Sequence, residues 1–223
     1  MITTEIDHDV KQIQLVIADD HPLVREGVKK VLERSGENIT VVQEASDAGE
    51  LMEVLATTVP DLVILDITMP GQNGLDTLKD IKETYANLPV LMLSMHPEDR
   101  FALRTLRAGA AGYLNKESVS TKLVTAIKHI VIDKKRFISP SVAEEMADHL
   151  DDNGKKQPHQ LLSDREYQVL CLIASGKKVK EIAAELELSN HTIHTYRSRV
   201  MKKMDLSTNV ELTHYALKHN LID

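Results

Sequence analysis

The fold is decided by the stretch Leu62-Val63-Ile64-Leu65-Asp66-Ile67-Thr68-Met69-Pro70-Gly71-Gln72-Asn73-Gly74. It begins with four aliphatic residues, which are typical of a short buried strand, and runs through an acid into a segment of turn-forming residues. An amphipathic stretch from Leu75 to Tyr85 follows and predicts a helix. A buried strand followed by a helix is the repeating unit of a parallel sheet with crossover helices.

The same alternation extends in both directions and occurs five times between residues 13 and 133. The expected strands are Ile13 to Ala18, Ile39 to Glu44, Leu62 to Leu65, Val90 to Leu93 and Gly112 to Leu114. The expected helices are Leu23 to Arg34, Ala48 to Thr57, Leu75 to Tyr85, Glu98 to Ala108 and Ser118 to Asp133. About 120 residues of this kind predict one α/β domain, a doubly wound five-stranded parallel sheet.

Beyond Asp133 the sequence changes character. Residues 134–160 combine charged residues and helix breakers around a short helical stretch, Val142 to Leu150, and are typical of a linker. Residues 161–223 predict an all-α domain of four helices with a helix-turn-helix layout. Its boundaries are marked by a capping box at Ser163 and Glu166, a stop at Gly176, a helix from Lys180 to Leu186, a cap at Ser189 and a helix from Asn209 to Lys218. The expected domains are therefore 1–133 and 161–223, with 134–160 as the linker.

The composition is that of a soluble globular protein. Hydrophobic residues at 42% and charged residues at 27% argue against disordered, collagen-like and disulfide-rich classes. The single cysteine, Cys171, cannot form an internal disulfide, and its apolar neighbours favour a buried position over a redox sensor. No apolar run approaches the ~20 residues that span a bilayer. We therefore expect a cytoplasmic protein that does not enter the membrane.

Polar side chains stand where the predicted strands end. Asp19 and Asp20 follow the first strand and Asp66 the third, while Ser94 follows the fourth and Lys116 the fifth. Ligands of parallel sheets gather at the carboxyl ends of the strands, so these side chains should converge. Three carboxylates at one point repel each other unless a cation is present, and Mg²⁺ prefers oxygen ligands. The pattern predicts a magnesium site suited to phosphoryl transfer, with one carboxylate as nucleophile.

These residues also resemble a known family, the receiver domains of bacterial two-component response regulators. The resemblance rests on Ala18-Asp19-Asp20-His21, Leu65 to Gly74, Leu93-Ser94 and Gly109-Ala110-Ala111-Gly112-Tyr113-Leu114-Asn115-Lys116. It implies that Asp66 is the phosphoacceptor and that Ser94 and Lys116 hold the phosphoryl oxygens. It further implies Mg²⁺ ligation by Asp20, by Asp66, by the Thr68 carbonyl and, mainly through water, by Asp19. Ser94 and Tyr113 would form the switch pair. Glu117 departs from the family, in which a proline often follows the lysine.

The third helix of the second domain is typical of a nucleic-acid reader. The whole chain has a net charge of −7, but Ser189 to Met204 carries four basic residues and no acid. Ile193, Tyr196, Val200 and Met204 share one face of the predicted helix. The remaining surface is polar and basic, which suits base edges and phosphates in the major groove. The candidate DNA contacts are Thr192, His194, Thr195, Arg197, Ser198, Arg199, Lys202 and Lys203.

This region resembles the LuxR-type helix-turn-helix domain, and with the receiver it resembles the NarL/FixJ group of response regulators. The resemblance rests on Leu162 to Glu166, Ile173 to Gly176, Lys180 to Ala183, Leu188-Ser189, Thr192-Ile193 and Lys202-Lys203-Met204. It implies a dimer contact on the fourth helix, formed by Val210, Leu212, Ala216 and Leu217, and half-sites ~34 Å apart. It also implies that the unphosphorylated receiver masks the reading helix. Lys178 and Val179 replace the family's hydroxyl cap and asparagine.

The sequence thus predicts a transcription factor that is not an enzyme. A sensor histidine kinase would phosphorylate Asp66, and homodimers would then bind double-stranded DNA; RNA polymerase is a candidate partner. Two alternatives remain open. The first is an aspartate-dependent phosphohydrolase, although Thr68 stands where such enzymes place a proton-donating acid. The second is a binding protein whose receiver no longer accepts phosphate.

Overall fold

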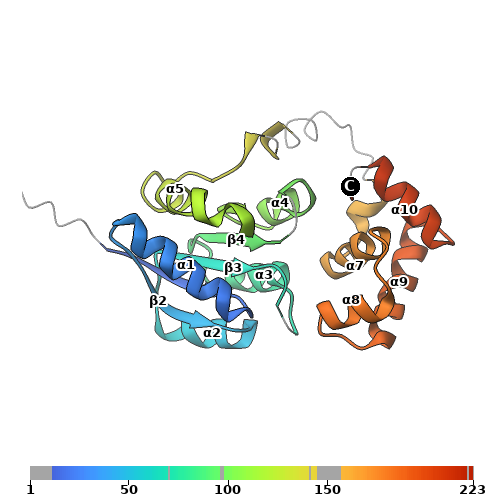
Figure 1. Cartoon of the computed structure of the whole chain (residues 1–223), viewed down its shortest axis with the longest axis horizontal. Helices are drawn as coiled ribbons and strands as arrows, with labels where there is room; N and C mark the ends of the chain where they lie inside the picture. Colours follow the sequence, from blue (N-terminus) through green and yellow to red (C-terminus); the bar gives the residue numbers. More distant parts are fainter. Residues whose placement is uncertain are drawn as a thin grey trace, which may run out of the picture.

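The computed structural model describes residues 12–69, 71–95, 98–140, 142–144, 157–219 and 221–222. The first domain is a five-stranded sheet in the order β2-β1-β3-β4-β5, and all neighbouring strands are parallel (Figure 1). The strands are β1 (Ile13–Ala18), β2 (Ile39–Ala45), β3 (Leu62–Asp66), β4 (Val90–Ser94) and β5 (Gly112–Asn115). The helices between and after them are α1 (Pro22–Ser35), α2 (Ala48–Thr57), α3 (Gly74–Thr84), α4 (Glu98–Arg107) and α5 (Val119–Val131).

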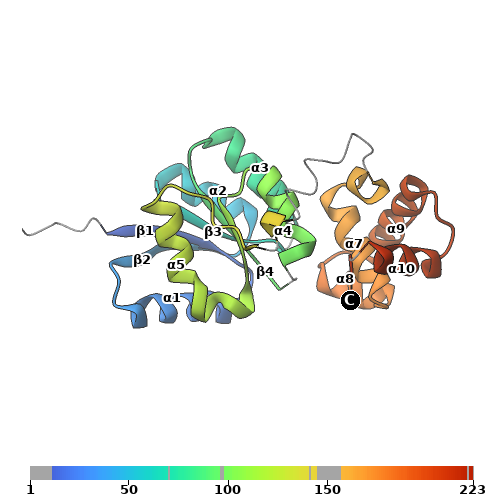
Figure 2. The same cartoon turned by 90° about the horizontal axis from the view of Figure 1, so that it is seen from above.

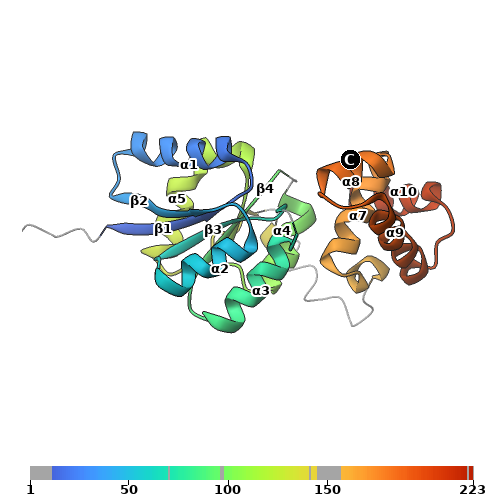
Figure 3. The same cartoon turned by 90° about the horizontal axis from the view of Figure 1, so that it is seen from below.

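Helices cover both faces of this sheet. Figure 3 shows α1 and α5 on one face and α2, α3 and α4 on the other. Alternate residues of each strand point to opposite faces, and this alternation divides the apolar core into two layers. Leu15, Ile17 and Ile64 pack under α1 and α5, whereas Val16, Val63 and Leu65 pack under the other three helices. Because both faces are covered, the central strands β3 and β4 are buried along their whole length and consist almost entirely of aliphatic residues, whereas the edge strand β2 is only partly buried.

The order of the strands fixes where a ligand site forms. β1 pairs with β2 on one side and with β3 on the other, so the chain direction across the sheet reverses at β1. The crevice of a doubly wound sheet lies outside the carboxyl ends of the strands at this reversal. Asp19 directly follows β1 and Asp66 is the last residue of β3, so both acids lie at that crevice.

The second domain consists of helices joined by short turns (Figure 2). They are α7 (Asp164–Ala174), α8 (Val179–Glu185), α9 (Asn190–Met204) and α10 (Asn209–Lys218), preceded by the 3-10 turn η2 (Pro158–Leu161). Ser163 and Glu166 form a capping box at the start of α7, and Ser189 accepts a hydrogen bond from the Thr192 N–H at the start of α9. Leu170, Ile193 and Leu212 meet in the domain core, and each is fully buried.

The predicted fold class is confirmed, and the predicted strands differ from the observed ones by at most one residue at either end. Cys171 is buried, as expected.

The predicted helix from Val142 to Leu150 lies largely outside the described residues; Val142 to Glu144 are helical. The side chain of Lys178 does not cap α8. Instead, the carboxylate of Glu181 in the first turn accepts a hydrogen bond from the Lys178 backbone N–H at 2.7 Å. The domain boundaries stay predictions.

The linker begins by pairing with the sheet. The Phe137 N–H donates to the Ala111 carbonyl at 2.8 Å, and Gly112 forms a parallel bridge with Phe137. A Cβ atom on Gly112 would lie 2.9 Å from the Phe137 carbonyl oxygen. Glycine at this position therefore allows the linker to approach the outer edge of β5.

Gly74 is required by the close approach of α3 to the end of β3. A Cβ atom at this position would lie 1.9 Å from the backbone oxygen of Asp66. We expect Gly74→Ala to lower the free energy of unfolding by about 3 kcal/mol or more, because the backbone at Asp66 must move.

Urea denaturation measures this loss. The matched control is Gly27→Ala in α1, where a Cβ atom meets nothing within 4 Å. Alanine favours a helix over glycine, so this control should be neutral or more stable by up to about 1 kcal/mol. Equal stability of the two variants would contradict the close approach.

Candidate functional site

The predicted cluster of acids forms at the carboxyl edge of the sheet. Asp19 and Asp66 are buried, and the ammonium group of Lys116 lies between them. Its Nζ atom is 2.7 Å from Asp19 Oδ2 and 3.0 Å from Asp66 Oδ2. Lys116 follows β5, two strands away from β3. The order of the strands thus brings together a lysine and two acids that are far apart in the sequence.

His21 joins this cluster, a contact that the sequence pattern does not predict. It is the N-cap residue of α1, and its Nδ1 atom lies 3.1 Å from Asp19 Oδ1 and 2.8 Å from Asp20 Oδ1. Its backbone N–H also donates to Asp19 Oδ1 at 2.9 Å. The signal that could have revealed it is its position directly after the acid pair, where a side chain able to hydrogen-bond stands between the end of β1 and the start of α1.

The donor set suits a divalent metal ion. Asp19, Asp20, His21 and Asp66 each offer one ligand atom, and these atoms lie within 4.8 Å of one another. Asp19 Oδ2, Asp20 Oδ1 and Asp66 Oδ2 are buried, and among the described residues they face only the Lys116 ammonium and the His21 imidazole, at ion-pair distance. Buried carboxylates that outnumber the cations beside them are costly. Three of them in one place fit a hard cation that takes oxygen ligands.

The electrostatics agree with this geometry. Burial raises the pKa of Asp66 to about 7, the Lys116 ammonium opposes that rise, and the nearby Asp19 and Asp20 carboxylates add to it. Burial by itself lowers the pKa of Lys116, but the attraction of Asp66 and Asp19 outweighs it and raises the pKa overall. The lysine therefore stays charged, and one cation faces three acids. An additional positive charge at this site would favour the ionised form of Asp66.

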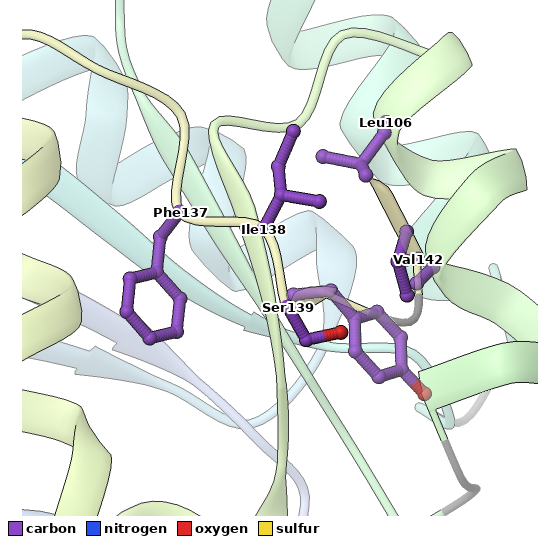
Figure 4. Close-up of a pocket in the computed structure, with 7 residues that line it drawn as sticks. Leu106, Phe137, Ile138, Ser139 and Val142 are labelled. Carbon is purple, nitrogen blue, oxygen red and sulfur yellow. The ribbon is translucent and has the colours of Figure 1, made fainter. Parts of the chain in front are cut away.

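The two predicted switch residues lie on neighbouring strands. Ser94 ends β4, and Tyr113 lies in the middle of β5; both are buried. Tyr113 lines a small pocket, shown in Figure 4, with Leu106 of α4 and Ile138, Ser139 and Val142 of the linker. A rotation of the Tyr113 ring would therefore alter its contacts with α4 and with the linker. Thr68, whose carbonyl is a predicted metal ligand, is half-buried in the loop after β3.

The predicted DNA-contacting surface of α9 is largely open. His194, Ser198, Arg199 and Lys202 are exposed, whereas Ile193, Val200 and Met204 are buried on the opposite face. Thr192, Thr195 and Arg197 are half-buried, and the Arg197 Nε atom donates to Asn209 Oδ1 at 2.8 Å. Lys203 is exposed, but its Nζ atom lies 2.6 Å from a carboxylate oxygen of Glu166 in α7. In this arrangement the receiver does not bury the reading side chains, contrary to the expectation that it masks them.

The predicted dimer contact on α10 needs a correction. Val210 and Leu217 are exposed, at 78% and 48% of their surface, and they stay candidates for a dimer contact. Leu212 and Ala216 are 0% exposed, because that face of α10 packs against the domain's own core. Leu212 and Ala216 are core residues, and their assignment to the dimer contact is wrong.

No helix in the described ranges combines the length and the apolar character that crossing a lipid bilayer requires. The described part of the chain thus offers no membrane-spanning helix.

The raised pKa of Asp66 leads to a stability prediction for the metal-free protein. An aspartate has a pKa of 3.8 when unperturbed, and the folded value is about 7, so the folded form binds this proton more tightly. Stability is then lost as the pH rises from about 4 to 7. Asp66→Asn removes this loss, so in EDTA it should raise the unfolding free energy at pH 8 by about 1–3 kcal/mol and have little effect below pH 4.

Urea denaturation at both pH values checks this, with the exposed Glu83→Gln as the matched surface control. Excess Mg²⁺ should reduce the difference, because the ion stabilises only the wild type. An Asp66→Asn protein that is less stable than wild type in EDTA at pH 8 would contradict the account of a buried, repelled carboxylate.

Comparison with known proteins identifies the family of each domain. The family model for the response regulator receiver domain matches residues 15–128, and the model for the luxR family of bacterial regulatory proteins matches residues 160–216. The chain is 36% identical to the response regulator UvrY of Escherichia coli K12 over 94% of this chain and 95% of that protein. It is 32% identical to the response regulator GacA of Pseudomonas aeruginosa over 95% and 98% of the two chains.

Solved structures give the same result. A structure of RcsB from Salmonella enterica serovar Typhimurium, bound to promoter rprA in the presence of the phosphomimetic BeF3-, matches with a TM-score of 0.60 and 28% identity. That match covers 91% of this chain and 98% of the RcsB chain. The acidic site, the basic reading helix and these likenesses together place the chain in the family of response regulators that join a receiver domain to a LuxR-type DNA-binding domain.

Proposed function

We propose that Asp66 is the phosphoacceptor of this response regulator, and that a sensor histidine kinase supplies the phosphoryl group. The observation that carries the proposal is the position of Lys116, whose ammonium bridges Asp66 and Asp19 within a cluster of three acids. A lone buried acid would not need this arrangement. A site that receives a phosphoryl group needs a carboxylate, a cation and a place for a metal ion within a few ångströms.

Each residue has a defined task in the transfer. A carboxylate oxygen of Asp66 attacks the phosphorus of the kinase phosphohistidine, and the imidazole nitrogen leaves with the electron pair of the P–N bond. Lys116 Nζ lies 3.0 Å from Asp66 Oδ2 and is placed to hold a phosphoryl oxygen. The Ser94 hydroxyl at the end of β4 would hold another. Mg²⁺, held by Asp20, Asp66 and the Thr68 carbonyl and through water by Asp19, would neutralise the charge that the carboxylates and the phosphoryl group share.

The output is regulated binding to DNA. We propose that phosphorylated chains pair and place two copies of α9 in successive major grooves. His194, Ser198 and the half-buried Thr195 would face base edges, while Arg199 and Lys202 would contact phosphates. Val210 and Leu217 are exposed apolar residues on α10 that suit a contact between the paired domains. We further propose that the bound dimer changes transcription through RNA polymerase and that the protein acts in the cytoplasm.

Phosphoacceptor identity can be tested with acetyl phosphate as the donor. Asp66→Asn should abolish incorporation of phosphate, whereas Asp80→Asn, which changes an exposed acid on α3, should label like the wild type. Labelling of the wild type should also disappear in EDTA and return with excess Mg²⁺. Full, Mg²⁺-dependent labelling of the Asp66→Asn protein would reject Asp66 as the acceptor.

The reading surface can be tested by the dependence of DNA affinity on salt. Lys202→Ala should weaken binding to an operator found by genomic footprinting and lower the slope of log K against log salt by about 1. Lys218→Ala, which removes an exposed lysine of α10, is the matched control and should leave the slope unchanged. Equal slopes for the wild type and Lys202→Ala would show that Lys202 does not contact a DNA phosphate.

A further inference from the structure

One arginine of α1 holds the backbone between the two acids that follow β1. The Arg25 Nη1 atom donates to the Asp19 carbonyl at 2.6 Å, and its Nε atom donates to Glu44 Oε2 in β2 at 2.7 Å. The Asp19 carbonyl belongs to the peptide group that joins Asp19 to Asp20. Arg25 therefore contacts the acid pair at the point where the chain has left β1 and has not yet entered α1.

The backbone of Asp19 is held on both sides. Its N–H donates to the Ala45 carbonyl at 3.1 Å, and Ala45 directly follows Glu44 in β2. These bonds, with the two made by Arg25, close a ring that runs from the end of β1 through α1 to the end of β2. A backbone segment that is fixed at its N–H and at its carbonyl has little freedom to rotate. The ring therefore sets the directions in which the Asp19 and Asp20 side chains leave the chain.

Glu44 is well suited to anchor Arg25. Lys29, one turn further along α1, places its Nζ atom 2.7 Å from Glu44 Oε1, while Arg25 occupies Oε2. The hydrogen bond from Lys29 is the main cause that lowers the pKa of Glu44; burial opposes it, and the hydrogen bond from Arg25 lowers the pKa further. Glu44 thus stays ionised at neutral pH. Its charge compensates that of Arg25, so the guanidinium adds little net positive charge beside the acid cluster.

The two cations on Glu44 have different reach. Both tie α1 to the edge of the sheet, and Figure 3 shows this helix lying along the face of the sheet. The ion pairs of Lys29 within the described ranges are with Glu26 and Glu44, neither of which belongs to the acid cluster. An ammonium group is therefore sufficient to join helix and strand. The planar fork of Arg25 adds a second, directed N–H donor for the Asp19 carbonyl.

We propose that Arg25 is a positioning residue for the metal site: by holding the Asp19 carbonyl, it directs the Asp19 and Asp20 side chains so that both can serve one Mg²⁺ ion. The inference rests on the proposed function of the acid cluster. Asp66 ends β3 and is fixed by strand pairing, whereas Asp19 and Asp20 lie beyond the last residue of β1. Their placement depends on the turn that Arg25 holds. Removing a group that orients metal ligands typically lowers metal affinity by about 10- to 100-fold.

The test measures binding of Mn²⁺ to the full-length chain from the electron paramagnetic resonance signal of the free ion. Mn²⁺ is the probe because it takes the same oxygen ligands as Mg²⁺. Arg25→Met should bind Mn²⁺ about 10-fold more weakly than the wild type. Arg25→Lys should also bind more weakly, since one ammonium group cannot reproduce the fork that joins the Asp19 carbonyl to Glu44. Lys29→Met, which breaks the other ion pair of Glu44, is the matched control and should bind like the wild type.

The sign of the change separates positioning from charge. If Arg25 acted only through its charge, methionine would strengthen the binding of a divalent cation and lysine would leave it unchanged. Unchanged or tighter binding by Arg25→Met, or wild-type affinity in Arg25→Lys, would overturn the proposal. An equal loss in Lys29→Met would overturn it as well, because any tie between α1 and β2 would then suffice. If urea denaturation in EDTA shows that Arg25→Met does not fold, Arg25→Lys decides.

Labelling by acetyl phosphate gives a second readout. The Mg²⁺ concentration for half-maximal labelling should rise in Arg25→Met by the same factor as the Mn²⁺ dissociation constant. The rate in saturating Mg²⁺ should stay near that of the wild type, because the acids are then held by their bonds to the ion. A lower saturated rate with an unchanged Mg²⁺ requirement would contradict a positioning role.

Failure of the proposed function gives a different result. If the acid cluster is not the metal site, Asp20→Asn will bind Mn²⁺ like the wild type. If Asp66 is not the phosphoacceptor, Asp66→Asn will still be labelled. If only the role of Arg25 is wrong, Asp20→Asn will bind weakly and Asp66→Asn will not be labelled, while Arg25→Met binds Mn²⁺ normally.

Discussion

Repulsion between three carboxylates at one edge of a buried sheet is the constraint on which this molecule depends. Asp19 and Asp66 are carried there by β1 and β3, whose pairing is fixed by fully buried aliphatic residues. The packing of the core therefore forces like charges together. The ammonium group of Lys116, which follows β5, offsets part of this repulsion. The remainder fits the divalent cation that we propose for this site, and such a cation would in turn stabilise a phosphoryl group there.

The same repulsion between carboxylates gives the receiver a way to act on the rest of the chain. A phosphoryl group would change the balance of charge at the edge where β4 ends at Ser94 and β5 ends two residues after Tyr113. Tyr113 borders α4 and the linker, and α4 holds α7 through Arg104 and Phe101. The site where the charge changes is thus connected, through Tyr113, to α4, the helix that contacts α7 of the second domain. Such an arrangement suits a shift between two populations of the molecule.

Much of this could be predicted from the sequence, because local patterns encode it. The strands follow from short aliphatic runs, and the site residues follow from the rule that parallel strands end at one edge. His21 was missed because its contacts depend on how α1 begins. Leu212 and Ala216 were misassigned because the apolar pattern of a helix does not tell whether a face packs on its own domain or on a partner. The contacts of Arg104 with Asp164 join residues from different domains, and no local pattern encodes such a pair.

The pairing of Phe137 with the edge of β5 has a consequence for how tightly the two domains need to grip each other. The connecting chain stays packed on the receiver from Phe137 to Val142 and enters the second domain near Gln157, so about 15 residues separate the anchors and span at most about 50 Å. A tether of this length keeps a detached domain at a local concentration on the order of millimolar. An association far too weak to join two independent proteins would therefore suffice to keep this one closed, and a modest input of free energy would suffice to open it.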